Sequence, residues 1–144
     1  MEKLILHPTE TSQWHALLNE AQVDCKCFLG EDVESYLVFL LMRFTQSPHL
    51  ANSVLALDFM KSNTYTGKIK RELLQEVGDK SLLFSGLFPG LADKKSVSID
   101  YFIDMGETAY HTVAEIDACD LFHALAGSFK MMSEVLRVMH SIQK

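Results

Sequence analysis

The sequence has few of the residues that mark specialised protein classes. Its 144 residues include only three prolines, seven glycines and three cysteines, which excludes collagen-like, low-complexity and disulfide-rich chains. Basic residues are outnumbered, 13 to 19, and the net charge of −6 argues against nucleic acid or an anionic membrane as the main partner. Hydrophobic residues make up 48% of the chain, which is enough for one sizeable core. We therefore predict a globular protein with a single domain, residues 1–144.

Targeting and membrane-spanning segments are also missing from the sequence. Residues 1–6 form too short an apolar start for a signal peptide. The longest uncharged apolar segments, 35–42 and 81–92, fall short of the roughly 20 residues that a spanning helix needs. We expect no membrane span and a cytoplasmic location.

Apolar residues recur at helical spacing along most of the chain, and the alternation typical of strands is absent. The sequence therefore predicts an all-α bundle of five to six helices. One long helix is expected to continue through Gly78, although this glycine could equally bend or break it. The predicted helices follow residues 9–21, 31–44, 47–60, 69–88, 98–113 and a last segment after Asp117.

The segment 31–44 is expected to lie at the centre of the bundle. Its residues 36–42 are all apolar, a pattern that a buried strand would also give. The acidic residues Glu31, Asp32 and Glu34 favour a helix, because the helix dipole stabilises negative charge in the first turn. We interpret the segment as a central helix that is apolar on nearly every face.

Histidine and carboxylate spacings give no direct support for a metal site. No two of the six histidines lie three or four residues apart, and HExxH and CxxC are absent. The nearest pieces of a di-iron bundle are Asp120 with His123 and Glu107 with His111, and only the first pair has the required offset of three. We expect these residues at the surface, no bound metal and no cofactor. Asp58, within LALDFM, is expected to be a partly buried, hydrogen-bonded acid.

Nucleophilic catalysis has no recognisable motif either. Ser85 lacks the glycine two positions earlier that a nucleophile elbow requires. Cys25 and Cys27 flank Lys26, which could lower a thiol pKa, but no base or resolving partner can be named. A bridge between these two cysteines is geometrically poor, so we expect them and Cys119 to be reduced thiols.

Aromatic residues gather on either side of the Pro89–Gly90 turn. They could line a pocket for an apolar ligand, although packing between adjacent helices explains them as well. These residues are Phe84, Phe88, Tyr101, Phe102 and Tyr110.

The same region carries a resemblance. GDKSLLFSGLFPG and SIDYFIDMGETAY, within residues 78–110, are similar to a group of small uncharacterised bacterial all-α proteins that share a GD, LLFSGLFP and YFxxMGxxAY pattern. The resemblance covers about a quarter of the chain, implies a bacterial cytoplasmic helical protein and transfers no active site. An alternative role for Gly78, Gly86 and Gly106 is only to let helices approach closely. If the pattern marks a ligand site, the predicted residues are Asp79, Ser85, Phe88, Tyr101, Asp104 and Tyr110.

The last predicted helix carries a broad apolar stripe. Phe129, Met132, Leu136 and Met139 repeat at alternating spacings of three and four, as in a coiled-coil seam. The stripe could be internal core, but the apolar surplus favours contact with a second copy. Our leading hypothesis is a non-enzymatic, self-associating interaction or regulatory module, a homodimer with a possible further protein partner. The alternative is a bundle that binds a small apolar ligand, and a carboxylate–metal enzyme is less favoured.

Overall fold

The computed structural model describes residues 11–46, 55–88 and 98–143, without the side chains of 55–58, 142 and 143. All regular structure in these ranges is helical, which confirms the all-α prediction. No helix within them is both long and apolar enough to cross a bilayer. The helices are α1 (Thr11–Cys25), α2 (Glu31–Gln46), α3 (Leu55–Ser62), α4 (Gly67–Gly86), α6 (Ile99–Asp117), α7 (Asp120–Gly127) and α8 (Phe129–Gln143).

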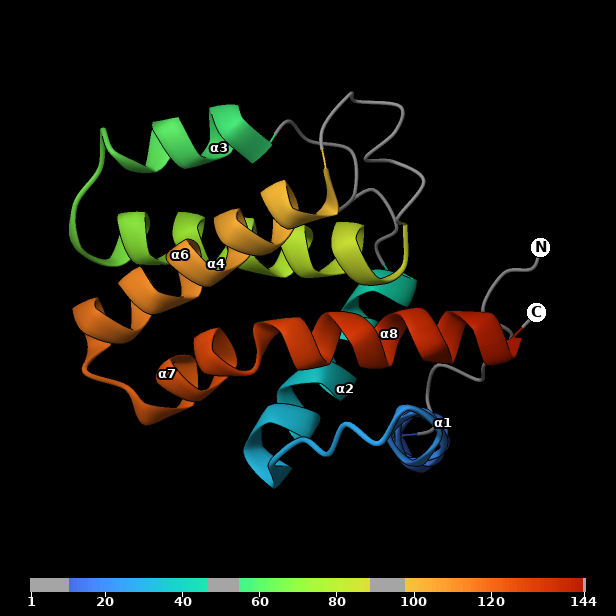
Figure 1. The fold of residues 1–144 in the computed structure, drawn as a ribbon. Coiled ribbons are helices and arrows are strands. Elements are labelled where there is room, and N and C mark those ends of the chain that lie inside the picture. Colours follow the sequence, from blue (N-terminus) through green and yellow to red (C-terminus); the bar gives the residue numbers. More distant parts are fainter. Residues whose placement is uncertain (1–10, 47–54, 89–97, 144) are drawn as a thin grey trace.

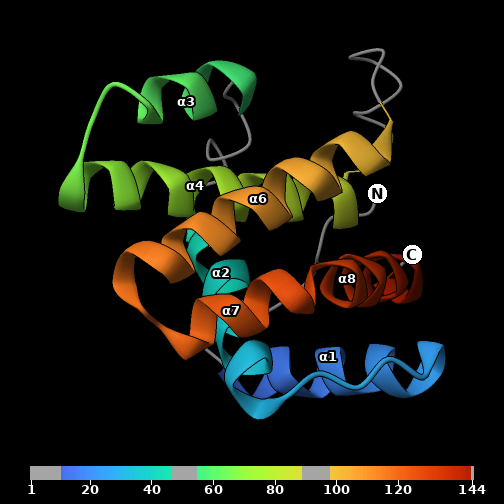
Figure 2. The ribbon, with the colours of Figure 1, turned by 60° about the vertical axis from the view of Figure 1, so that its left-hand side comes forward.

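The helices are stacked in layers around one hydrophobic core. α4 and α6 lie side by side, with α3 against α4 on one side and α8 on the other (Figure 1). In a second view, α1 lies beneath α8, and α2 runs from the level of α1 towards α4 (Figure 2). Buried residues of α1, α2, α4, α6, α7 and α8 form a continuous core cluster.

Several predicted helix boundaries are observed. α2 begins at Glu31 with the three acidic residues in its first turn, and α4 continues through Gly78 without a break. Ser98 caps α6, because its hydroxyl oxygen accepts a hydrogen bond from the backbone N–H of Tyr101 at 3.2 Å. The predicted helix start at Ser47 and the Pro89–Gly90 turn lie outside the described residues.

The prediction of a single last helix is wrong, because two helices meet at Ser128. The backbone N–H of Ser128 donates to the carbonyl of Ala124 at 2.9 Å, and the Ser128 carbonyl accepts from the N–H of Met132 at 2.8 Å. Ser128 thus closes α7 and opens α8. This division accounts for seven helices in the described ranges, where five to six were expected.

The centre of the bundle is the second half of α4 rather than α2. Every residue from 77 to 87 is buried, because α3, α6 and α8 all pack against this helix. α2 is covered less completely, and Phe39, in the middle of its apolar segment, is 64% exposed. The expectation that residues 31–44 form the central helix is therefore corrected.

Three glycines allow helices to approach closely, as one interpretation of the pattern in residues 78–110 predicted. An added Cβ at Gly78 would lie 2.4 Å from Cε1 of Tyr110. At Gly106 it would lie 2.1 Å from Cζ of Phe129, and at Gly86 2.6 Å from Cβ of Leu136. The glycines therefore set the packing of α6 on α4 and of α8 on both.

We expect Gly106→Ala to lower the free energy of unfolding by about 2 kcal/mol, because the added methyl group overpacks the contact with Phe129. Gly127→Ala is the matched control, since nothing lies within 4 Å of its added Cβ and alanine favours a helix. Urea unfolding measures both variants. Equal stability of the two variants would contradict the close approach.

Candidate functional site

A buried carboxylate connects three helices. Asp79 on α4 is 2% exposed, and its Oδ1 accepts hydrogen bonds from the hydroxyl groups of Tyr36 on α2 and Tyr110 on α6, both at 2.6 Å. Nη2 of Arg43, also on α2, lies 2.7 Å from Oδ2. We call these four residues the Asp79 cluster. Both oxygens of the carboxylate are engaged by donors of the protein itself.

Local sequence explains how the cluster forms. Tyr36 and Arg43 are seven residues apart, which places both on one face of α2. Gly78, next to Asp79, has no side chain where the ring of Tyr110 lies. The rings of Tyr36 and Tyr110 meet edge to face at 6.1 Å between centroids. The cluster therefore depends on the same close approach of α4 and α6 that the glycines permit.

Burial dominates the electrostatics of the cluster. It raises the pKa of Asp79, while hydrogen bonds from Tyr110, Tyr36 and Arg43 act in the opposite direction. Burial also raises the pKa of Tyr36 and of Tyr110, and the charge of Asp79 adds to both shifts. Both tyrosine hydroxyl groups therefore remain protonated hydrogen-bond donors at neutral pH. Burial lowers the pKa of Arg43, but the hydrogen bond and charge of Asp79 outweigh it and raise that pKa overall.

A chain of hydrogen bonds runs from the Asp79 cluster to the surface. Gln75 donates through Nε2 to the hydroxyl oxygen of Tyr36 at 2.9 Å, and its Oε1 accepts from Nη1 of Arg71. Nε of Arg71 donates to Oδ2 of Asp117, at the end of α6, at 2.7 Å. The guanidinium group of Arg71 also lies 5.2 Å from the ring centroid of Phe122. Arg71 is thus held on several sides where α4 and α6 meet.

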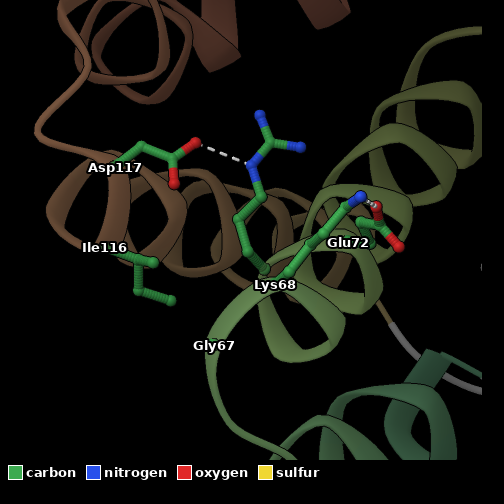
Figure 3. Close-up of a pocket in the computed structure, with 6 residues that line it drawn as sticks. Gly67, Lys68, Glu72, Ile116 and Asp117 are labelled. Atoms are coloured by element: carbon green, nitrogen blue, oxygen red, sulfur yellow. Dashed lines mark hydrogen bonds and ion pairs between the residues drawn. The ribbon is translucent and has the colours of Figure 1, made fainter.

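A surface pocket lies at this end of the chain of hydrogen bonds. It is an open hollow of about 420 Å³ between the first turns of α4 and the last turn of α6. Figure 3 shows the Asp117 carboxylate turned towards a guanidinium group, that of Arg71, and the Lys68 amine turned towards Glu72. We call it the end pocket; its lining residues are Gly67, Lys68, Arg71, Glu72, Ile116 and Asp117.

The charges around the end pocket oppose the dipoles of both helices. The first turn of α4 carries Lys68 and no acidic residue, although a helix N-terminus favours negative charge. The last turn of α6 carries Glu115 and Asp117 and no basic residue, although a helix C-terminus favours positive charge. Thr66, which precedes α4, makes no capping hydrogen bond with its side chain. Departures from local stability rules are typical of functional sites.

The structure brings together only two of the six residues predicted for a ligand site, Asp79 and Tyr110. Ser85 is buried elsewhere along α4, where its hydroxyl oxygen accepts from the hydroxyl of Ser133 at 3.0 Å. Arg137 of α8 donates to the backbone carbonyl of Ser85 at 3.2 Å and thereby satisfies a carbonyl at the end of α4. This second cluster ties α4 to α8.

The other three predicted ligand residues serve packing or face solvent. Phe88 meets the ring of Phe44 at 5.6 Å between centroids, and Tyr101 meets Phe102 at the same distance. Asp104 is exposed. Both aromatic pairs meet edge to face, and the predicted set does not form one ligand site.

The apolar stripe of α8 lies inside a single chain. Phe129, Met132, Leu136 and Met139 are each 0% exposed, because α8 packs against α1, α4 and α6. The glycines that contact Phe129 and Leu136 let α8 lie close to α6 and α4. The prediction that this stripe is a self-association surface is therefore corrected to internal core.

Sequence reasoning missed Tyr36 and Arg43 of the Asp79 cluster, and it missed Arg71 and Gln75 in the chain of hydrogen bonds. Arg71, Gln75 and Asp79 repeat every four residues, which places polar side chains along one line of α4. Tyr36 and Arg43 stand at the two ends of the apolar segment of α2 with helical spacing. Both spacings were available as signals in the sequence.

Metal and thiol chemistry find little support in the described part of the chain. No group of three histidine, cysteine or acidic residues there could hold a metal ion. The rings of His111 and His123 lie 5.8 Å apart, and both residues are exposed. The Asp58 side chain lies outside the described residues. The three cysteines form no disulfide, and a hydrogen bond with Cys25 raises the pKa of the Cys27 thiol.

Comparisons of the chain with models of protein families, with curated proteins and with solved structures find no match, so the interpretation of the site depends on its own geometry.

Proposed function

We propose that the protein is a non-enzymatic helical module that binds another protein chain through the end of the bundle where α4 begins and α6 ends. The observation that carries the proposal is the end pocket, whose charges oppose both helix dipoles. Such charges lower helix stability, so a role in binding gives a reason for their presence.

Exposed apolar side chains at the same end support the proposal. Ile116 lines the end pocket and is 42% exposed, and Ile69, in the first turn of α4, is 54% exposed. Tyr65, two residues before α4, is also exposed. We call these three residues and the residues that line the end pocket the end surface. Apolar side chains next to charges are typical of protein-binding surfaces.

The buried polar residues support a structural role better than catalysis. The Asp79 carboxylate has donors on both oxygens, and the Ser85 hydroxyl donates to the carbonyl of Leu82 at 3.2 Å. Groups that satisfy one another inside a core fix the positions of helices. The Asp79 cluster would accordingly hold α2, α4 and α6 in the arrangement that forms the end pocket.

Co-purification from cells that express the native protein tests the proposal with three tagged baits. The unmodified chain and Phe39→Asp should retain a protein partner, and Ile116→Asp should lose it, because only Ile116 belongs to the end surface. An untagged copy of the chain counts as a partner. Retention by all three baits, or no partner on the unmodified bait, would contradict the proposal.

A further inference from the structure

We infer that the partner at the end surface is a second copy of this chain, docked about a two-fold axis so that the start of α4 in each copy faces the end of α6 in the other. The inference rests on the proposed function and names the partner. It keeps the expected homodimer but places the contact at the end surface instead of at the stripe of α8.

The two edges of the end surface carry opposite charges. On α4, Lys68 and Lys70 form a basic edge. On α6, the exposed Glu115 forms an acidic edge. Arg71 and Asp117 lie between the two edges and pair with each other within one chain at 2.7 Å. A two-fold rotation places the basic edge of one copy on the acidic edge of the other, and it does so twice in the same interface. The end surface is therefore complementary to itself.

Exposure leaves both edges accessible. All residues from 63 to 69 and from 115 to 118 are exposed, and Lys70 is half-buried, so neither edge is fully covered by another part of the described chain. The Lys68 side chain is 86% exposed and that of Glu115 is 66% exposed. Each edge also carries an exposed isoleucine, Ile69 on α4 and Ile116 on α6. Contact with a second copy would bury both side chains away from water.

Net charge favours this orientation over other contacts between two copies. The chain has a net charge of −6, so two copies repel each other at most orientations. Lys68 and Lys70 place positive charge at the start of α4 on this acidic protein, and the exposed Glu115 at the end of α6 supplies a negative charge that they attract.

Exchanging one charge on each edge separates binding from folding. Lys68→Glu places an acid at the N-terminus of α4, and Glu115→Lys places a base at the C-terminus of α6. Both changes agree with the helix dipoles, but Lys68→Glu also replaces the Lys68–Glu72 pair with two like charges, and these effects oppose each other. Each variant should therefore melt close to the temperature of the unmodified chain. A loss of association by these variants therefore cannot be attributed to unfolding.

Sedimentation equilibrium of the purified proteins tests the inference. The unmodified chain should form a dimer, and each variant alone should dimerise at least about tenfold more weakly, because like charges then face each other at both contacts. An equimolar mixture of the two variants should recover the unmodified affinity, since both contacts of the mixed dimer pair opposite charges. Phe39→Asp is the control, and its dimerisation should not change.

Three results would overturn the inference. The first is an unmodified chain that stays monomeric up to about 1 mM. The second is a dimer whose affinity neither charge change lowers. The third is an equimolar mixture of the two variants that dimerises as weakly as each variant alone. A monomer that still captures another protein, and loses it with Ile116→Asp, would overturn the inference and leave the proposed function standing.

Discussion

Met132→Lys is expected to unfold the protein or to lower its free energy of unfolding by at least about 4 kcal/mol. The Met132 side chain is 0% exposed, in the middle of α8. Lysine there would remove apolar contacts and place a charge in the core, where water cannot solvate it. Urea unfolding followed by circular dichroism measures the change.

Met131→Lys is the matched control, because Met131 is the preceding residue of the same helix and is 37% exposed. Its stability should change by no more than about 0.5 kcal/mol. A Met132→Lys variant that kept full stability but lost self-association would return the stripe of α8 to the role of an interface.

Asp79→Ala is expected to lower the free energy of unfolding by about 3 kcal/mol. The substitution leaves the buried hydroxyl groups of Tyr36 and Tyr110 without their acceptor, and it leaves Arg43 without its ion-pair partner. The Arg43 side chain is about half exposed and can turn towards water, which limits the loss. Chemical denaturation gives the magnitude.

Two further variants show whether the Asp79 cluster accounts for that loss. Asp104→Ala removes an exposed aspartate and should leave stability within about 0.5 kcal/mol of the unmodified chain. Tyr110→Phe removes one hydrogen bond and should cost about 1 kcal/mol. Equal stability of Asp79→Ala and Asp104→Ala would contradict a structural role for the cluster.

Local signals in the sequence predicted much of the fold. The acidic start of α2 and the Ser98 cap of α6 depend on residues close together in the chain, so they could be identified without the tertiary structure. The break at Ser128 was missed because Phe122, Leu125, Phe129 and Met132 keep a spacing of three and four across it. Gly127 and Ser128 are nevertheless local signals for the end of one helix and the start of the next. The exposure of Phe39 instead depends on which helices cover α2.

The candidate site was less predictable for the same reason. Asp79 and Tyr110 were among the predicted residues, but their role depends on Tyr36 and Arg43, which come from another helix. The spacing of four that relates Arg71 to Asp79 was visible in the sequence. Its significance depends on the junction of α4 with α6, which only the packing of the two helices reveals.

We propose that the end of the bundle where α4 begins and α6 ends binds a second copy of the chain. Backbone amide chemical shifts, recorded by NMR while the purified chain is diluted from about 1 mM to about 10 μM, test this proposal residue by residue. We predict concentration-dependent shifts confined to residues 65–72 and 115–117, the segments that contain the end surface. Shifts that do not change with concentration, or that centre on α8 or on Phe39, would contradict it.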